Sequence, residues 1–470
     1  MYLRNLMSMD TEEMIRAQPM DVVVLLGGCD KTVPAQLMGA ASASVPAIQL
    51  VTGSMLTGSS DGERVGACTD CRRFWARFRA DEIDAAQIAR VNDQLVPSVG
   101  TCSVMGTAST MACVAEALGM ALPGSASPPA VIADRIRIAE RTGTTAVALA
   151  KSRLSPAQII TPKSIENALR VLLAIGGSTN GILHLTAIAG RVGIEVDLER
   201  LDALGRETPV LLDLKPSGQY YMEDFHRAGG VPALLRELKP LLHLDALTVT
   251  GRSLGEEIDA SGDGFAQSVV RPLHNPIYAE GGIAVLRGNL APGGAIIKQS
   301  AASARLMLHE GRAVVFENIE DMATRIDRDD LDVAENDILV LKNIGPKGAP
   351  GMPEAGYLPI PKKLARAGVK DMVRISDGRM SGTAAGTIVL HVTPESAIGG
   401  PLAYVKTGDR IRLDVSARAI TLLVSDEELA SRRVNCPVPP PAASRGYRKL
   451  FLEAVTQADQ GVDFDFLRAS

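Results

Sequence analysis

The feature that most constrains the fold is a short apolar run followed at once by glycines and then by a helical pattern. Residues 22–26 form such a run, two glycines follow it, and a helix-like segment opens near Pro34. A continuous apolar run of this length indicates a buried strand, and proline is favoured in the first turn of a helix. The same order recurs at residues 94–100, where we expect a second strand, before a helical pattern at residues 111–122. Repeated strand, turn and helix units predict an α/β domain with a largely parallel sheet over residues 1–280.

From about residue 281 the pattern changes to short β-rich runs separated by glycine and proline. These runs lie at residues 313–316, 337–341, 387–392 and 411–415. Several short strands with turn residues between them predict a second, β-barrel-like domain over residues 281–470. Near its end we expect an extended, proline-rich linker at residues 435–441 and a C-terminal helix within residues 447–466.

The first residues suggest two successive helices. Leu3, Leu6 and Met7 have the spacing of the last turns of one helix, whereas Asp10 and Glu13 suit a capping box that opens the next. We therefore expect a helix boundary at this capping box.

Composition excludes several classes of protein. Of the 470 residues, 46% are hydrophobic, which suffices for a large core, and the net charge of −5 leaves no basic surface for nucleic acid. Aromatic residues are only 3%, which argues against stacking platforms for bases. No run approaches the roughly 18 apolar residues of a membrane span, and the chain begins with an acidic segment, unlike a signal peptide. We therefore expect a cytoplasmic protein that acts on a small molecule, with neither a nucleic-acid nor a membrane partner.

Three polar side chains in a row follow the first expected strand. Cys29, Asp30 and Lys31 come directly after two glycines, at the carboxyl end of a strand, where open α/β sheets bind their ligands. Each side chain taken singly suits a solvated surface loop. The double glycine lets backbone approach another group closely, and together with the three polar groups it favours a metal or ligand site.

The other cysteines fall into different contexts. Six cysteines in a chain of this length do not form a disulfide framework, and thiols as metal ligands are the better hypothesis. Cys102 lies between an expected strand and a helix, like Cys29, whereas Cys113 suits a buried position on that helix. Cys68 and Cys71 form a CxxC pair, but no second pair at zinc-site spacing completes it, so we assign it no metal or redox role. Cys436 is expected to be exposed in the linker.

Two loops of the second domain carry further candidates. Glu354 follows a rigid stretch of glycine and proline at residues 345–353, and residues 376–383 contain Ser376 and Ser381 in a glycine-bounded turn. Such a turn is by itself weak evidence, because aspartate, glycine and serine are common turn residues. The segment at residues 176–181 is glycine-rich but lacks the ending that a phosphate-binding loop requires.

Together these motifs resemble those of the dihydroxy-acid dehydratase and phosphogluconate dehydratase family, over nearly the whole chain. The segments Cys29–Lys31 and Ser376–Thr383 are similar to the two signatures of the family. Further landmarks of the family are similar to residues 176–180, 353–354 and 391–395. Three further segments most resemble the sugar-acid branch of the family, the arabinonate and xylonate dehydratases. They are residues 66–74, 105–110 and 446–453.

The resemblance implies both a reaction and its cofactors. The expected reaction is dehydration of a 2,3-dihydroxy carboxylic acid, either a sugar acid such as arabinonate or xylonate or a branched-chain dihydroxy acid, to a 2-keto-3-deoxy acid. Cys29 and Cys102 are implied as ligands of an iron–sulfur cluster, two-iron rather than four-iron. Three further side chains are implied as Mg2+ ligands, namely Asp30, Lys31 as its carbamate, and Glu354. Ser381 is the implied base, and a homodimer or homotetramer is the implied assembly.

The chemistry of dehydration agrees with these roles. Hydroxide is a poor leaving group, so a Lewis-acidic iron with an open coordination position can accept it. Mg2+ prefers oxygen ligands, which a carboxylate pair and a carbamate supply. A serine is a weak base at its ordinary pKa, so Ser381 requires a nearby cation and backbone N–H groups that stabilise the alkoxide.

The sequence departs from the family pattern at its start. The family has one further cluster cysteine and one further metal-binding glutamate upstream of the Cys29 motif, and no cysteine precedes Cys29 here. Residues 1–20 resemble the interior of the family's N-terminal region, so we expect an N-terminal truncation. The alternative to an active enzyme is a catalytically impaired paralogue with a binding or structural role.

Overall fold

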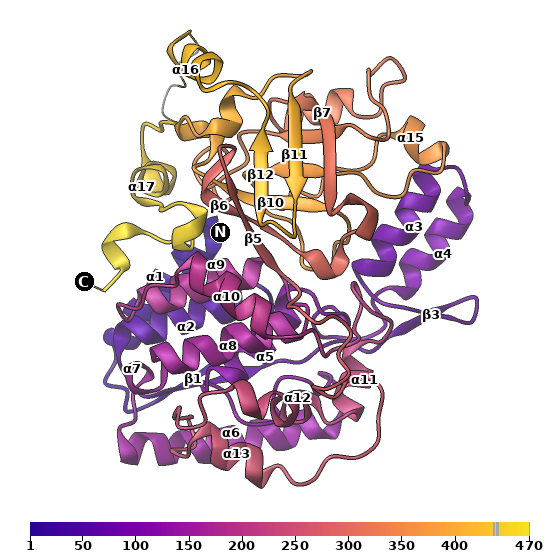
Figure 1. Cartoon of the computed structure of the whole chain (residues 1–470). Helices are drawn as coiled ribbons and strands as arrows, with labels where there is room; N and C mark the ends of the chain where they lie inside the picture. The colour runs from indigo at the N-terminus through magenta and orange to yellow at the C-terminus, as the bar shows by residue number, and fades with distance from the viewer. Residues whose placement is uncertain (436–437, 439–440, 470) are drawn as a thin grey trace. The chain divides into compact units, whose positions relative to one another are not determined.

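The structure is a computed structural model that describes residues 1–435, 438 and 441–469. Its labelled helices and strands are drawn in Figure 1. The chain forms two compact units that are not contiguous in sequence. The helical unit comprises residues 3–71 and 89–282 with a short segment from Leu467, and the barrel unit comprises residues 1–2, 72–88 and 283–466.

Up to residue 282 the chain is mainly helical. In chain order its elements are α1 (Tyr2–Arg16), β1 (Val23–Gly27), α2 (Thr32–Ala43), β2 (Ala47–Val51), β3 (Gly58–Ser60), β4 (Glu63–Val65), α3 (Thr69–Arg79), α4 (Ala85–Gln94), α5 (Thr107–Ala117), α6 (Ala133–Ser152), α7 (Pro156–Ile159), α8 (Pro162–Ala174), α9 (Asn180–Gly190), α10 (Leu198–Glu207), α11 (Met222–Arg227), α12 (Gly230–Leu238), η1 (Lys239–Leu241) and α13 (Leu254–Ala260).

Two fully buried helices form the centre of the helical unit. Every residue of α5 and of α9 is buried, and the two helices pack against each other and against α2 and α8. A helix that is enclosed on all sides must be apolar or small on all sides, which explains the alanine, serine and threonine residues of α5 and the alanine and glycine residues of α9. Beside them, β1 and β2 pair in parallel from Val23 with Ala47 to Gly27 with Val51, and α2 connects them.

The expected parallel sheet is much smaller in the structure. Among the described residues it consists of β1 and β2, extended by single parallel bridges from Gln49 to Ala121 and from Ser54 to Thr101. The strand expected at residues 94–100 is wrong: α4 ends at Gln94, and no strand follows before Thr101. Pro97 lacks a backbone donor, which disfavours a central strand there. Apolar periodicity alone does not distinguish a buried strand from a buried helix.

Two expectations about the ends of the chain also need correction. The capping box at Asp10 and Glu13 is absent, because α1 runs without interruption from Tyr2 to Arg16. Helix α17 spans residues 446–454, so only residues 447–454 of the expected 447–466 are in it, and 3-10 turns follow. The expected linker lies partly outside the described residues, as does Cys436.

From residue 283 the chain is mainly β-structure. In chain order its elements are β5 (Ala284–Gly288), β6 (Ala291–Ile297), η2 (Gln299–Ala301), η3 (Ala304–Leu306), β7 (Leu308–Phe316), α14 (Ile319–Arg325), β8 (Ile338–Leu341), α15 (Lys362–Arg366), β9 (Arg374–Ser376), β10 (Ile388–Thr393), η4 (Ser396–Ile398), η5 (Pro401–Tyr404), β11 (Arg410–Asp414), β12 (Ala419–Leu422), α16 (Asp426–Asn435), α17 (Gly446–Ala454), η6 (Ala458–Gln460) and η7 (Asp465–Leu467).

The expected β-barrel is confirmed. Eight strands close in the order β10-β6-β5-β12-β11-β7-β8-β9. Alternate residues of β7 belong to different cores, since Ala313 and Val315 pack in one apolar cluster with the other strands and Val314 and Phe316 pack in a second cluster with Ile326. This period of two is what a strand with both faces covered requires.

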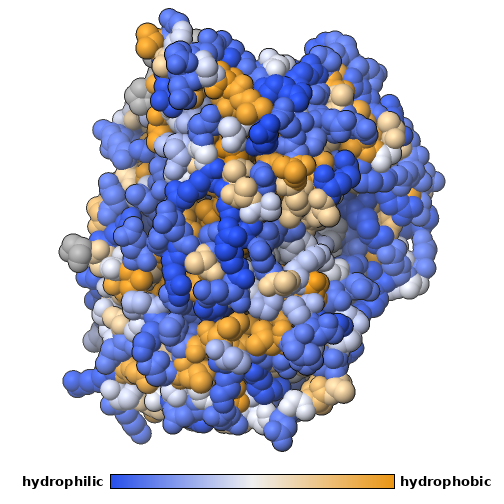
Figure 2. All heavy atoms as spheres, in the orientation of Figure 1, coloured by the Kyte–Doolittle hydropathy of each residue, from blue (hydrophilic) through white to orange (hydrophobic). Residues whose placement is uncertain are grey.

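The surface is consistent with burial of the apolar residues in these cores. On the face drawn in Figure 2, hydrophilic side chains predominate and apolar side chains form separate patches. Within the part of the chain that the structure describes, no helix combines the length and the hydropathy that a membrane span needs.

A buried arginine at the end of β2 should be important for the stability of the helical unit. Arg135, on α6, donates to the carbonyls of Val51 at 2.7 Å, Ser125 at 2.8 Å and Pro128, and burial lowers its pKa to about 10. Because Arg135→Met leaves these buried acceptors without a donor, we expect it to lower the free energy of unfolding by about 3 kcal/mol.

The measurement is urea denaturation followed by circular dichroism. Arg137→Met is the matched control on the same helix, because the Arg137 side chain is 68% exposed and pairs with the partly exposed Asp134. A loss of stability in the control equal to that of Arg135→Met would contradict the prediction.

Candidate active site and metal-binding residues

The Cys29–Lys31 segment forms the turn between β1 and α2. The backbone N–H of Thr32 donates to the carbonyl of Cys29 at 3.2 Å, and the Lys31 ammonium pairs with the Asp30 carboxylate. Gly28 is required here, because a Cβ at this position would lie 1.8 Å from Thr52 Oγ1. The structure therefore places the three predicted side chains together at the carboxyl end of β1, which is not buried on both faces as expected, because Val24 and Leu26 are exposed.

Cys102 lies beside a thiol to which the sequence analysis assigned no role. The Sγ atoms of Cys68 and Cys102 are 3.1 Å apart. The pKa of the Cys102 thiol is raised, first by the hydrogen bond with Cys68, then by burial, and then by the negative charges of Cys68, Cys29 and Asp30. Burial and the Asp30 carboxylate likewise raise the pKa of Cys29. Cys29 and Cys68 are therefore both close enough to Cys102 to raise the pKa of its thiol.

A buried hydrogen-bond network holds the Cys68 loop. Asp70 accepts from the Gly66 backbone N–H at 2.8 Å, from Lys215 at 3.0 Å and from the Tyr221 hydroxyl at 2.8 Å. Burial acts to raise the pKa of Asp70, but these donors outweigh it and the pKa is lowered. Cys68 itself has a φ of +75°, a region that residues other than glycine rarely adopt. Strain of this kind persists only where the surroundings hold it and is concentrated at functional sites.

The two remaining described cysteines lie in different surroundings. Cys71 is on the first turn of α3 and is half-buried, and Cys113 is fully buried on α5 as expected. The CxxC spacing was a signal that could have identified Cys68. The thiol that lies 3.1 Å from Cys68 is that of Cys102.

In the barrel unit, Arg379 joins the Glu354 loop to the Ser381 loop. Its guanidinium forms an ion pair with Glu354 and donates to the carbonyl of Met352, and its own carbonyl accepts from the Gly356 N–H at 3.0 Å. Arg379 is buried. The predicted metal carboxylate and the predicted base therefore lie on loops that one arginine connects at three points.

A buried carboxylate, that of Asp377, anchors the loop that contains Ser381 to neighbouring backbone. Asp377 accepts backbone N–H bonds from Ile344 at 3.0 Å and from Ser396 at 2.8 Å, and burial raises its pKa. Ser381 Oγ lies 2.8 Å from Thr383 Oγ1 and accepts a longer bond from the Thr383 N–H at 3.4 Å. The serine hydroxyl thus has two donors that can stabilise an alkoxide.

Two buried basic side chains near this turn were given no role from the sequence, although His391 lies in one of the family landmarks. His391, in β10, has a φ of +57° and donates its backbone N–H to Gly378 at 3.0 Å. Burial, followed by the positive charge of Arg379, lowers the pKa of its imidazole to about 3, so it is neutral. Lys298 follows β6 and reaches the Gly382 carbonyl. A single lysine after an apolar strand gives no local signal of function.

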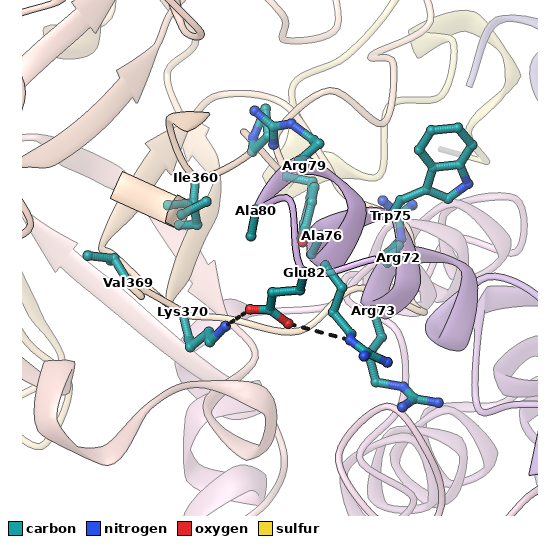
Figure 3. Close-up of a pocket in the computed structure, with 14 residues that line it drawn as sticks. Arg72, Arg73, Trp75, Ala76, Arg79, Ala80, Glu82, Ile360, Val369 and Lys370 are labelled. Carbon is teal, nitrogen blue, oxygen red and sulfur yellow. Dashed lines mark hydrogen bonds and ion pairs between the residues drawn. The ribbon is translucent and has the colours of Figure 1, made fainter. Parts of the chain in front are cut away.

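A separate pocket in the barrel unit contains none of the predicted site residues. It has a volume of about 470 Å³, and Figure 3 shows it between α3 and the segment around Lys370. Four arginines and Lys370 line it, and its carboxylate, Glu82, is paired with Lys370 at 2.8 Å and Arg77 at 3.4 Å. Its wall also includes Tyr357, which packs against the cluster around Met380.

The donor sets distinguish two kinds of metal site. Within the described residues, no three or more His, Cys, Asp or Glu side chains are already grouped so as to hold one metal ion. The negative charges of Cys68 and Cys29 raise the pKa of the Cys102 thiol, and a bound cationic metal relieves such repulsion. Thiolates suit iron–sulfur clusters. The carboxylates of Asp30 and Glu354 are each neutralised by a basic side chain, Lys31 and Arg379, and carboxylate oxygens suit Mg2+.

Comparison with known proteins identifies the class of enzyme. Residues 1–257 match the N-terminal domain, and residues 268–462 the C-terminal domain, of the dihydroxy-acid/6-phosphogluconate dehydratases. The chain belongs to this family and is a dehydratase, that is, a carbon–oxygen hydro-lyase. The resemblance inferred from its motifs is confirmed.

Several relatives narrow the comparison within the family. The chain is 50% identical to an L-arabinonate dehydratase of Rhizobium leguminosarum bv. trifolii, covering 100% of this chain and 81% of the relative. It is 50% identical to an L-arabonate dehydratase of Azospirillum brasilense, covering 99% and 82%. A 6-deoxy-6-sulfo-D-gluconate dehydratase of Pseudomonas putida is 46% identical, covering 100% and 81%. Sugar-acid dehydratases are thus more similar to this chain than a dihydroxy-acid dehydratase of Geobacter, which is 41% identical over 97% and 82%.

Proposed function

We propose that the protein dehydrates a sugar acid with hydroxyl groups at C2 and C3, of the arabinonate or xylonate class, to the corresponding 2-keto-3-deoxy acid. The proton on C2 is removed, the hydroxyl on C3 leaves and is released as water, and the resulting enol becomes the ketone. The 50% identity to L-arabinonate and L-arabonate dehydratases supports this substrate class over a branched-chain dihydroxy acid.

The observation that carries the proposal is the link that Arg379 makes between two loops of the barrel unit. A base and a metal carboxylate must act on neighbouring atoms of one small substrate, so they have to be held in a fixed relation. Arg379 lies two residues before Ser381 in the chain. It supplies the fixed relation through its ion pair with Glu354 and through the bond that its carbonyl accepts from the Gly356 N–H.

Ser381 is the proposed base. In its alkoxide form, its oxygen would accept hydrogen bonds from the Thr383 hydroxyl and backbone N–H, both of which lie within hydrogen-bond distance of Oγ. The buried Asp377 fixes the preceding residues of the loop, so the turn loses little freedom when substrate binds. Ser381 then takes the C2 proton.

Cys29 and Cys102 would hold an iron–sulfur cluster, which we propose is two-iron, and Asp30, Lys31 as a carbamate and Glu354 would hold Mg2+. When bound, these groups supply a Lewis acid for the departing hydroxyl and positive charge for the substrate carboxylate. Lys31 as an ammonium now neutralises Asp30, and its carbamate would instead add an oxygen donor to the same loop.

Cys68 is a further proposed cluster thiol. Two thiolates on one tetrahedral metal ion lie roughly 3.8 Å apart, given metal–sulfur bonds of about 2.3 Å. The 3.1 Å separation of the Cys68 and Cys102 sulfurs needs only a small adjustment to reach that value. This proposal replaces the expectation that Cys68 has no metal role.

The test is a substrate comparison with anaerobically reconstituted protein. We expect 2-keto-3-deoxy acid from L-arabinonate or D-xylonate, with kcat/KM at least about tenfold above that for a branched-chain 2,3-dihydroxy acid, a difference of about 1.4 kcal/mol. A preference for the branched-chain acid would contradict the proposed substrate class. Keto-acid formation that is unchanged in Ser381→Ala would contradict the proposed site.

A further inference from the structure

Lys298 is a fully buried lysine beside the Ser381 turn. It follows the last residue of β6, and its side chain has no exposure to solvent. Its Nζ lies 3.5 Å from the carbonyl oxygen of Gly382, the residue after Ser381. This distance is at the upper limit for a hydrogen bond, so the contact by itself is weak.

Backbone pairing keeps this part of the chain in place. Ile297 pairs with Val389 at the start of β10, and the Gly386 N–H donates to the Ala301 carbonyl at 2.8 Å. The Ser303 N–H donates to Thr387 Oγ1 at 3.1 Å. The residues that follow β6 therefore lie along the segment that connects Ser381 to β10. These backbone contacts fix the position of Lys298 relative to this segment.

Lys298 has no carboxylate to neutralise it among the described residues. Burial is the sole cause that lowers its pKa, from the ordinary 10.5 to about 7. Two buried basic side chains of the barrel unit are paired with carboxylates, namely Arg374 with Asp371 at 2.6 Å, and Arg379 with Glu354.

Another buried lysine of the barrel unit shows the usual arrangement. Lys342 follows β8 and has its Nζ 3.0 Å from Glu317 Oε1. An ammonium buried without such a partner is strongly unfavourable, so groups of this kind are concentrated where function requires them. The burial of Lys342 is therefore explained by its ion pair with Glu317, whereas the burial of Lys298 without a carboxylate requires another explanation.

We propose that Lys298 is a positioning residue for the Ser381 base, holding the Gly382 carbonyl and supplying the positive charge that stabilises the Ser381 alkoxide. This inference rests on the proposed function. It accounts for the cation that a serine base requires without using the basic groups already paired to carboxylates. Charge beside the serine lowers the free energy of the alkoxide more than that of the hydroxyl.

The kinetic test compares Lys298→Met, Lys298→Arg and the control Lys342→Met in reconstituted protein over a range of pH. We expect Lys298→Met to lower kcat by about 10²-fold or more with KM changed less than about threefold. Lys298→Arg should recover a large part of kcat and move the alkaline decline of kcat to higher pH, because arginine keeps its charge. Equal losses in Lys298→Arg and Lys298→Met with an unchanged pH profile would show a purely structural role and overturn the proposal.

A second measurement does not depend on activity. Between about pH 7 and the ordinary lysine pKa the unfolded chain binds a proton that folded Lys298 does not, so the destabilisation is full at low pH and diminishes as pH rises. Lys298→Met should therefore unfold at a higher temperature than wild type near pH 6, and the difference should disappear toward pH 10. A difference that does not change with pH would contradict the proposal. If this pattern is seen but wild type forms no keto acid, the proposed function fails, and with it the positioning role of Lys298.

Discussion

Ser381→Ala abolishes exchange of the substrate C2 proton with solvent while leaving the iron and magnesium content of the protein unchanged. The expected loss in kcat is about 10³-fold or more, because removal of a general base forfeits the proton-transfer step. The Thr383 hydroxyl lies 2.8 Å from Ser381 Oγ and is proposed to act as its hydrogen-bond donor, not as a base. Proton exchange is followed by NMR in deuterated buffer, and metal content by elemental analysis.

Ser416→Ala is the control for this experiment. Ser416 lies in the turn between β11 and β12, where its hydroxyl donates to Asp414 at 2.9 Å, and it is exposed. The control should retain wild-type exchange. Exchange in Ser381→Ala at the wild-type rate would mean that another residue is the base, and loss of metal in this variant would mean that the serine has a structural role.

Replacement of the thiols by serine removes the iron–sulfur cluster. Cys102→Ser and Cys29→Ser should each lower bound iron and sulfide to less than about a tenth of the wild-type content and remove the visible absorption, because serine is a hard ligand with a far weaker preference for iron. Cys68→Ser should cause a partial or full loss as well, since its sulfur lies 3.1 Å from that of Cys102. Iron, sulfide and absorption are measured after anaerobic reconstitution.

Cys113→Ala is the matched control for the thiol variants. Cys113 is as fully buried as any residue of α5 but lies within an apolar helix, and burial raises the pKa of its thiol. It should bind a wild-type amount of iron. Full cluster content in Cys68→Ser would restrict the cluster thiols of the described residues to Cys29 and Cys102 and would restore the expectation drawn from the sequence.

The elements that sequence reasoning predicted correctly are those with a local cause. Strand β1 and helix α2 follow from an apolar run, two glycines and a proline, all within about twenty residues. The barrel strands follow from short β-rich runs between turns, and the closed barrel is confirmed. The two elements that were predicted wrongly also have local causes. The strand expected at residues 94–100 contained a proline, and the capping box at Asp10 was an accidental match inside one continuous helix.

The sequence by itself determined the family and the chemical content of each loop, because thiols, carboxylates and glycines at fixed spacing are visible without a fold. Tertiary structure alone decided which of those groups meet. Cys68 reaches Cys102 across 34 positions, and Lys298 reaches Gly382 across 84, through the topology of one unit in each case. Such pairings depend on how helices pack and how strands close a barrel, and no local periodicity encodes them. A buried lysine without a counter-ion is likewise a property of the folded core, because only burial separates Lys298 from an ordinary surface lysine.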